Sequence, residues 1–354
     1  MSGLLASVLA AIQDGRVIPA HPLSLDVDGK FDEQRQRALT RYYVAAGSGG
    51  LAVGVHTTQF AIRDPAIGLF EPVLAIAADE MDRADAYRAE PLIRIGGICG
   101  RTAQALDEAD LLARLGYHAG LLSLAAMADA DEDVLVAHCA AVGARIPLVG
   151  FYLQPSVGGR PLSYAFWRRF AEIPAVVAIK IAPFNRYQTL DVVRAVIDAG
   201  RDDIALYTGN DDAIVADLVT PFRFAVGGRP VERRIVGGLL GHWAVWTRGA
   251  VSLLGECQAA ARAGHIPTPL LQRGIEVTDA NAAFFDAAHG FAGCIAGIQE
   301  VLRRQGLVRS TRCLSAHDVL SPGQAADIDR VCGAYPHLAD DDFVRAHLDE
   351  WLRC

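Results

Sequence analysis

The chain has 354 residues, 52% of them hydrophobic and 21% charged, which is the composition of a globular protein with a large buried core. The formal net charge of −8 argues against a nucleic acid or an anionic membrane surface as the partner. No stretch of about 20 apolar residues occurs, so we expect no membrane span. The seven cysteines are scattered without a C-x-x-C pair, which fits a reducing cytoplasm.

Short apolar runs rich in β-branched residues recur along the first two thirds of the chain, and we interpret each as a strand. They are residues 17–20, 51–55, 91–95, 120–123, 147–152, 175–180, 204–207 and 234–238. Segments with helical periodicity lie between them. These include residues 32–46, 102–115, 131–142 and 190–198.

Eight buried strands that alternate with helices predict an α/β fold, a parallel (β/α)8 TIM barrel. The alternative is a doubly wound open sheet, which normally carries a glycine-rich phosphate loop after its first strand. Residues 21–24 occupy that position here and read His-Pro-Leu-Ser, so we favour the barrel. The strand signal stops after about residue 245 and helical segments follow. We therefore predict a barrel with the catalytic site over residues 1–245 and a C-terminal helical region packed on it over residues 246–354.

The chain contains only two lysines, and the other 31 of its 33 basic residues are arginines. Lys30 lies in a polar turn, whereas Lys180 ends an apolar run with the composition of a buried strand. An amine held in a low dielectric loses its proton more easily and becomes a nucleophile. Lys180 is therefore our candidate for amine chemistry, the alternative being a strand-end lysine that extends to solvent.

Barrel enzymes place their catalytic groups at the C-terminal ends of the strands. Thr57 and Thr58 follow the second predicted strand, and Tyr152 ends the fifth, next to the strand of Lys180. A tyrosine and a lysine on neighbouring strands can meet above the barrel, where the hydroxyl group relays protons to the lysine-bound carbon framework. We expect Tyr152 and Lys180 to form this pair.

Three segments resemble the dihydrodipicolinate synthase and N-acetylneuraminate lyase superfamily of class I aldolases. The opening strand and turn over residues 17–32 resemble the start of that family, and residues 151–155 resemble its Tyr-Asn-x-Pro element. Residues 177–180 resemble the strand that ends in the Schiff-base lysine, and the 28-residue separation of Tyr152 from Lys180 is typical of the family. The resemblance covers residues 17 to about 245.

The resemblance implies a role for each matching residue. Lys180 would form a Schiff base with the C2 carbonyl of a 2-oxo acid, and Tyr152 would carry the protons. Thr57 and Thr58 would bind the carboxylate of that acid. The family needs no cofactor, and it is commonly homo-oligomeric, so we expect a dimer or a tetramer.

This chain also departs from the family at several positions. The family's Gly-Thr-Thr-Gly-Glu reads His-Thr-Thr-Gln-Phe over residues 56–60, and His56 is either a second acid/base group or a histidine satisfied at the top of the barrel. The aromatic residues after the fourth strand and the arginine after the Tyr-Asn-x-Pro element are missing. We therefore do not expect the lysine-biosynthetic synthase reaction itself.

Weaker candidates lie in the later loops. Asn185 and Arg186 follow Lys180, and Arg186 binds a distal carboxylate or phosphate in one interpretation and forms a cap or surface ion pair in the other. Gly237 and Gly238 either approach a carboxylate through their backbone or form a tight turn. Asp211, after the seventh strand, binds substrate hydroxyls or caps a helix. The ten histidines have no metal-ligand spacing, so we predict no metal.

The resulting hypothesis is a cofactor-independent Schiff-base lyase or aldolase that acts on pyruvate or a longer 2-oxo acid. The alternative from another class is a barrel that binds a 2-oxo acid without turnover, as a sensor or partner protein. An unrelated barrel in which Lys180 is incidental stays open as a third interpretation.

Overall fold

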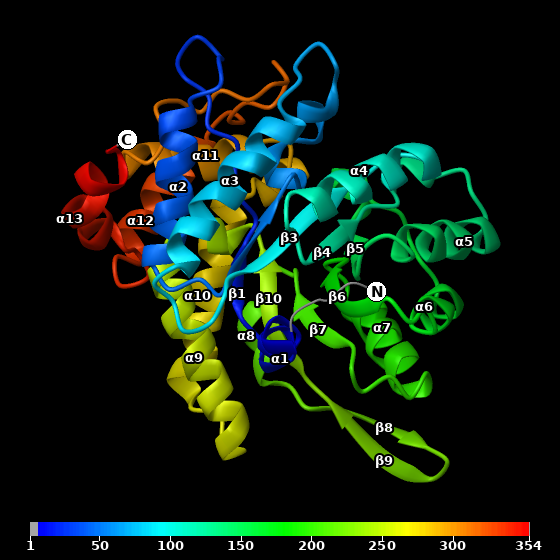
Figure 1. Cartoon of the computed structure of the whole chain (residues 1–354). Coiled ribbons are helices and arrows are strands. Elements are labelled where there is room, and N and C mark those ends of the chain that lie inside the picture. The colour runs from blue at the N-terminus through cyan, green and yellow to red at the C-terminus, as the bar shows by residue number, and fades with distance from the viewer. Residues whose placement is uncertain (1–5, 354) are drawn as a thin grey trace.

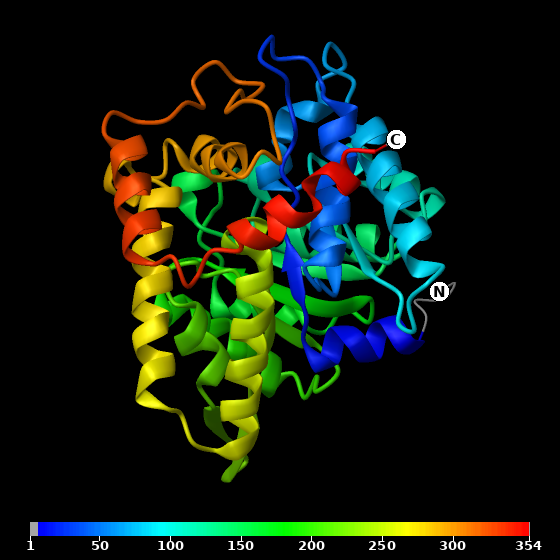
Figure 2. The same cartoon turned by 90° about the vertical axis from the view of Figure 1, so that its left-hand side faces the viewer.

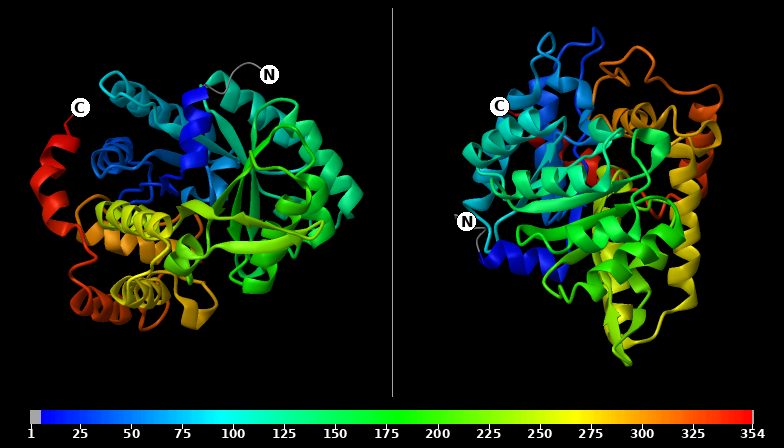
Figure 3. Two further views of the ribbon diagram at one scale, coloured as in Figure 1. Left: turned by 90° about the horizontal axis from the view of Figure 1, so that it is seen from below. Right: turned by 90° about the vertical axis from the view of Figure 1, so that its right-hand side faces the viewer.

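The computed structural model describes residues 6–353 and contains a closed barrel of eight parallel strands (Figures 1 and 3). The strands are β1 (Val17–Pro19), β2 (Gly50–Val53), β3 (Ile93–Ile98), β4 (Ala119–Leu122), β5 (Leu148–Leu153), β6 (Val176–Ala182), β7 (Ala205–Thr208) and β10 (Ile235–Leu240). They pair in sequence order from β2 to β7, then β10 and β1. A parallel bridge between Ala20 and Ala52 joins β1 to β2 and closes the ring. The (β/α)8 barrel predicted from the sequence is confirmed.

Helices follow the strands and form the outer ring. They are α2 (Glu33–Ala45), α3 (Phe70–Asp85), α4 (Thr102–Arg114), α5 (Glu132–Gly143), α6 (Tyr164–Phe170), α7 (Arg186–Asp198), α8 (Ile214–Val219) and α9 (Thr247–Ala263). Side-chain caps set several of their starts: Asp32 accepts the N–H of Arg35, and Asp131 accepts that of Val134. Helix α9 follows β10, as the other helices of the ring follow their strands, and it packs on α8 and β1.

The side chains of the strands divide into two core layers, because successive residues of a strand face opposite sides. On β6, Ala178 and Ala182 belong to the layer inside the barrel, and Ile179 and Ile181 to the layer under the helices. Helix α1 (Ala6–Asp14) packs on the inner layer at the end of the barrel where the strands begin (Figure 2). The opposite end, where the strands end, is therefore the end that can hold a site.

The C-terminal region is helical, as predicted. It contains α10 (Thr268–Phe284), α11 (Cys294–Arg304), α12 (Gln324–Ala334) and α13 (Asp341–Trp351). Helix α10 packs on α8 and α12, and α13 packs on α2. Helix α11 lies across the end of the barrel opposite α1 (Figure 2). The region therefore covers the mouth of the barrel as well as its side.

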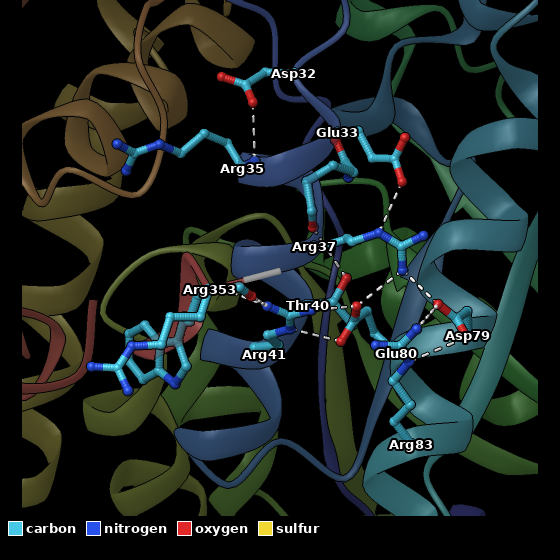
Figure 4. A network of polar contacts seen from close by, with 12 residues as sticks. Asp32, Glu33, Arg35, Arg37, Thr40, Arg41, Asp79, Glu80, Arg83 and Arg353 are labelled. Carbon is cyan, nitrogen blue, oxygen red and sulfur yellow. Dashed lines mark hydrogen bonds and ion pairs between the residues drawn. The ribbon is translucent and has the colours of Figure 1, made fainter. Parts of the chain in front are cut away.

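Ion pairs join α2 to α3, and hydrogen bonds from Arg41 join α2 to the C-terminal region (Figure 4). The carboxylate of Glu80, 3% exposed, accepts hydrogen bonds from Arg37 at 3.0 Å and Arg41 at 2.7 Å. Arg41 also donates to the carbonyl oxygen of Trp351 at 2.8 Å. One buried carboxylate thus organises two arginines, one of which holds the last turn of α13 against the barrel.

An antiparallel hairpin of β8 (Phe222–Val226) and β9 (Arg229–Arg233) projects from the barrel between α8 and β10 (Figure 1). We did not predict it. Its signal is visible in the sequence, because alternating side chains flank Gly227 and Gly228, a pair that favours a two-residue hairpin turn. Across residues 6–353, every helix is too short or too polar to cross a bilayer.

Candidate active site

Lys180 faces the interior of the barrel near the C-terminal end of β6 and is 7% exposed. Its Nζ atom lies 4.4 Å from the centre of the Phe151 ring, and Phe151 is its register partner on β5. The two side chains line a cavity of about 70 Å³. A single water needs roughly 10–15 Å³ by the same kind of measure, so the cavity holds a solute of several heavy atoms.

The cavity is built by the barrel and the C-terminal region together. Its lining residues are Ala20, Val55, His56, Thr57, Phe151, Leu153, Gln154, Val157, Lys180, Ala182, Phe184, Gly209, Asp211, Gly241, Phe285, Phe291, Cys294 and Ile298. The last four come from α11 and from the connection between α10 and α11. These residues lie over the barrel mouth and line the cavity from the side opposite the strands.

Two glycines make this close packing possible. A Cβ atom on Gly209 would lie 2.8 Å from Cε of Lys180, and one on Gly241 would lie 2.8 Å from the ring of Phe285. Both distances are shorter than carbon atoms tolerate. Gly209 therefore leaves the space that the Lys180 side chain occupies, and Gly241 leaves space for the aromatic cover.

Asp211, which follows β7, brings a carboxyl group to the cavity. Its Oδ1 accepts the backbone N–H of His242 at 2.9 Å, and its carbonyl oxygen accepts a hydrogen bond from Asn281 at 2.7 Å. Burial lowers the pKa of Lys180 and raises the pKa of Asp211, while the attraction between their charges opposes both shifts. The cavity thus favours a neutral amine beside a protonated carboxyl group more than water does.

The turn over residues 56–58 brings two of the predicted residues to the cavity. His56 and Thr57 line it, and the Thr57 hydroxyl donates to the carbonyl oxygen of Ala20 at 2.8 Å. Within residues 6–353, the backbone N–H groups of His56 and Thr57 have no acceptor. Burial, and then the charge of Lys180, lower the pKa of His56 to about 4, so its ring is neutral at neutral pH.

Thr58 does not line the cavity. Its hydroxyl donates to the carbonyl oxygen of His21 at 2.7 Å and accepts the N–H groups of Gly54 at 3.0 Å and Val55 at 3.1 Å. With these bonds the hydroxyl is fully used in shaping the turn. Thr58 therefore positions the turn, and its hydroxyl is not free for a carboxylate.

Tyr152 does not meet Lys180, in contrast to our expectation. Its side chain lies in the outer layer against Trp167, with ring centres 5.3 Å apart. Its hydroxyl donates to the carbonyl oxygen of Leu162 at 3.1 Å and accepts the Leu162 N–H at 3.2 Å. Because side chains alternate along β5, Phe151 takes the inward position beside Lys180.

Asn185 and Arg186 also lie away from the cavity. Asn185 caps α7, accepting the N–H of Tyr187 at 2.9 Å. Arg186 forms an ion pair of 2.6 Å with the buried Asp217, the ion-pair alternative of our sequence interpretation. Asp217 accepts a hydrogen bond from Asn210 at 2.9 Å, whose Oδ1 accepts the N–H of Phe184 at 3.0 Å. Arg186 is thus linked to the loop of Phe184 through Asp217 and Asn210, and it does not line the cavity.

Gly237 and Gly238 serve packing rather than the cavity. A Cβ atom on Gly237 would lie 2.7 Å from the backbone of Arg16, and one on Gly238 would lie 2.4 Å from the ring of Trp243. These contacts lie toward the start and the outside of β10. The glycine of this strand region that does line the cavity is Gly241.

Sequence reasoning also missed residues that the cavity contains. Asp211 was noted only as a possible hydroxyl ligand, although a carboxylate just after a barrel strand is itself the signal for a catalytic group. Phe151 was overlooked because its neighbour Tyr152 matched the expected tyrosine. The phenylalanines at positions 285 and 291 had no local signal, because their place depends on how the C-terminal helices fold over the barrel.

This chain is similar to known proteins in sequence over part of its length and in fold over most of it. No family model matches the chain. It is 27% identical over 199 residues to the 4-hydroxy-tetrahydrodipicolinate synthase of Bifidobacterium longum, a match that spans 56% of this chain and 60% of the relative. Among solved structures, N-acetylneuraminate lyase from Fusobacterium nucleatum matches with a TM-score of 0.70 and 14% identity, over 92% of this chain and 99% of that one.

Two further structures match as well. Dihydrodipicolinate synthase from Bacteroides thetaiotaomicron has a TM-score of 0.70 and 16% identity, over 92% of this chain and 99% of that one. A prophage protein of the dihydrodipicolinic acid synthase family from E. coli K12, solved in complex with pyruvate, also has a TM-score of 0.70, with 16% identity over 91% and 97% of the two chains. The barrel has the fold of the dihydrodipicolinate synthase and N-acetylneuraminate lyase superfamily, as its motifs predicted.

Proposed function

We propose that this barrel is a lyase or aldolase that needs no cofactor and forms a Schiff base between Lys180 and pyruvate or a longer 2-oxo acid. One observation carries the proposal: a buried lysine with a lowered pKa faces a covered cavity at the C-terminal end of the barrel, in the fold of Schiff-base enzymes. The sequence resemblance around Lys180 supports the same assignment.

The turn over residues 56–58 supplies a place for the carboxylate of the 2-oxo acid. The free N–H groups of His56 and Thr57 suit an anion, because backbone N–H groups in such turns bind carboxylates. A carboxylate held there leaves the C2 carbonyl next to the lysine. The neutral amine of Lys180 attacks C2, water leaves, and the iminium then withdraws electrons from C3.

Asp211 takes the acid/base role that we had assigned to Tyr152. It lines the same cavity as Lys180, and burial raises its pKa, so the carboxyl group can hold a proton that the reaction needs. As an acid it donates to the hydroxyl group that leaves C2 as water. As a carboxylate it removes the proton from C3 to give the enamine.

The test is borohydride reduction in the presence of pyruvate, followed by intact mass measurement and peptide mapping. Lys30 is the internal control, because it is the only other lysine of the chain. We expect one pyruvate adduct on Lys180 and none on Lys30. Lys180→Met should abolish the adduct and Lys30→Met should leave it unchanged. An unmodified Lys180, with pyruvate and with longer 2-oxo acids, would contradict the proposal.

A second candidate function has its own support. The register partner of Lys180 on β5 is Phe151, whose ring carries no hydroxyl group. A barrel with a Schiff-base lysine but incomplete proton transfer would bind a 2-oxo acid without turning it over. An adduct on Lys180 together with no exchange of the C3 protons of pyruvate into heavy water, followed by NMR, would favour this binding protein over the enzyme.

A further inference from the structure

The cavity is apolar away from the lysine. Of its 18 lining residues, 11 are apolar and two are glycines. Only His56, Thr57, Gln154, Lys180 and Asp211 have polar side chains. Arginine is absent from this lining, although it supplies nearly all the basic residues of the chain.

This lining limits what a second reactant can carry. A second carboxylate or a phosphate would be buried without a cation of its own, since the charge of the iminium on Lys180 faces the first carboxylate and disappears when the enamine forms. A chain of hydroxyl groups would find few partners, because the Thr57 hydroxyl is bonded to Ala20 and one oxygen of Asp211 to His242. Gln154 and His56 are the other polar side chains of the lining besides Lys180. Buried hydroxyls without partners lose binding energy. Sugars and dicarboxylates therefore fit poorly.

Two phenylalanines form an aromatic pair at the cavity. Phe184 follows β6 and Phe291 precedes α11, and their rings meet edge to face with centres 5.5 Å apart. Both have left-handed backbone conformations, with φ of 52° and 70°. Bulky residues rarely adopt such angles, and strain of this kind gathers at ligand-binding positions.

The surrounding structure holds both strained residues in place. The N–H of Phe184 donates to Asn210 at 3.0 Å, and the N–H of Phe291 donates to the carbonyl oxygen of Asp286 at 3.0 Å. Phe285 adds a third ring, for which Gly241 leaves space. These contacts pre-position flat apolar surfaces over the Schiff-base carbon framework.

We propose that the second reactant is an aldehyde with a flat apolar group, aromatic or conjugated, which packs against Phe184, Phe291 and Phe285. The proposal rests on the Schiff-base function above. In the addition, C3 of the enamine bonds to the aldehyde carbon and the aldehyde oxygen takes a proton from Asp211. Water then releases a 4-hydroxy-2-oxo acid from Lys180. In the reverse direction the C3–C4 bond breaks and its electrons pass to the iminium nitrogen.

The test compares benzaldehyde, glyceraldehyde and succinic semialdehyde as partners of pyruvate with the full-length protein. We expect kcat/KM for benzaldehyde to exceed the other two by at least about tenfold, the scale of discrimination that apolar pockets reach. Cleavage of 4-hydroxy-2-oxo-4-phenylbutanoate should follow the same preference. Equal or greater rates with glyceraldehyde or succinic semialdehyde would overturn the proposal.

A variant separates pocket selectivity from the intrinsic reactivity of the aldehydes. Phe291→Leu should lower the ratio of kcat/KM for benzaldehyde to that for glyceraldehyde several-fold, about as one lost aromatic contact predicts. Phe224→Leu, on the projecting hairpin, is the matched control and should leave the ratio unchanged. An unchanged ratio in Phe291→Leu would refute the aromatic contact.

Trapping with pyruvate alone distinguishes the two proposals. An adduct on Lys180 without a preference for benzaldehyde, or without any aldol product, overturns the aromatic partner and leaves the Schiff base standing. Absence of the adduct overturns both.

Discussion

Replacing Tyr152 with phenylalanine separates the role expected from the sequence from the role that the structure shows. The Tyr152 hydroxyl is buried and bonds to both backbone groups of Leu162, at 3.1 and 3.2 Å. Tyr152→Phe keeps the ring against Trp167 and removes only these two bonds. The variant should therefore lose stability and keep its chemistry.

The size of the stability loss follows from the group left behind. The buried N–H of Leu162 loses its acceptor, which costs about 1–3 kcal/mol. For a chain of 354 residues the entropy of unfolding is about 0.7 kcal/mol/K, so the expected drop in Tm is roughly 1–4 °C.

The catalytic expectation is the opposite of that for a proton relay. Loss of a general acid/base group lowers the rate by about 10²–10⁴-fold, whereas we expect Tyr152→Phe to stay within about twofold of the parent. The assay is the rate of borohydride-trapped adduct formation with pyruvate, alongside a thermal melt. Asp211→Asn is the comparison and should show the large loss. A hundredfold slower Tyr152→Phe with an unchanged Tm would refute our placement of the side chain.

Three further predictions concern the lysine, the glycine beside it and a buried ion pair of the barrel. Because burial lowers the pKa of Lys180, the rate of adduct formation should rise with pH, with a midpoint below 10.5, the ordinary pKa of a lysine. A midpoint at or above 10.5 in a rapid-quench pH series would contradict the burial argument. Gly209→Ala places a Cβ atom 2.8 Å from Cε of Lys180 and should slow borohydride trapping at least about tenfold. Gly255→Ala is the control, because its Cβ meets nothing within 4 Å, and it should leave the rate unchanged. Equal rates for the two variants would show that the Lys180 side chain moves aside without loss. Glu108→Gln removes the charge that pairs with Arg63 at 3.0 Å, and both side chains are 8% exposed. The free energy of unfolding should therefore fall by about 3–5 kcal/mol. A thermal or denaturant melt indistinguishable from that of the parent would disprove this loss.

Local patterns were sufficient for the barrel and for the lysine. Each strand is apolar on both faces, and this composition identifies a buried parallel strand without any knowledge of its neighbours. Lys180 ends such a run in a chain with one other lysine, so its burial followed from composition and position. The hairpin of β8 and β9 also had a local signal, the alternation around Gly227 and Gly228, which we overlooked.

Strand register decided which side chain faces the lysine. The 28-residue spacing pointed to Tyr152, but the pairing of β5 with β6 shifts between Leu148 and Val149 and sets Phe151 opposite Lys180. A shift of one residue exchanges the two faces of a strand, and sequence spacing does not determine where such a shift occurs. The same limit applies to Gly237 and Gly238, which face packing contacts while Gly241 reaches the cavity.

Short stretches of composition and periodicity were enough to predict the barrel and the buried amine, because both depend on local sequence. The tertiary structure alone decided the environment of that amine. Asp211 meets Lys180 only because β7 lies beside β6, and Phe285 and Phe291 reach the cavity only because the C-terminal helices fold back over the barrel. The residues that surround Lys180 thus come from 31 positions away, at Asp211, to 111 positions away, at Phe291, and their place follows from how whole elements pack rather than from any segment's own preference.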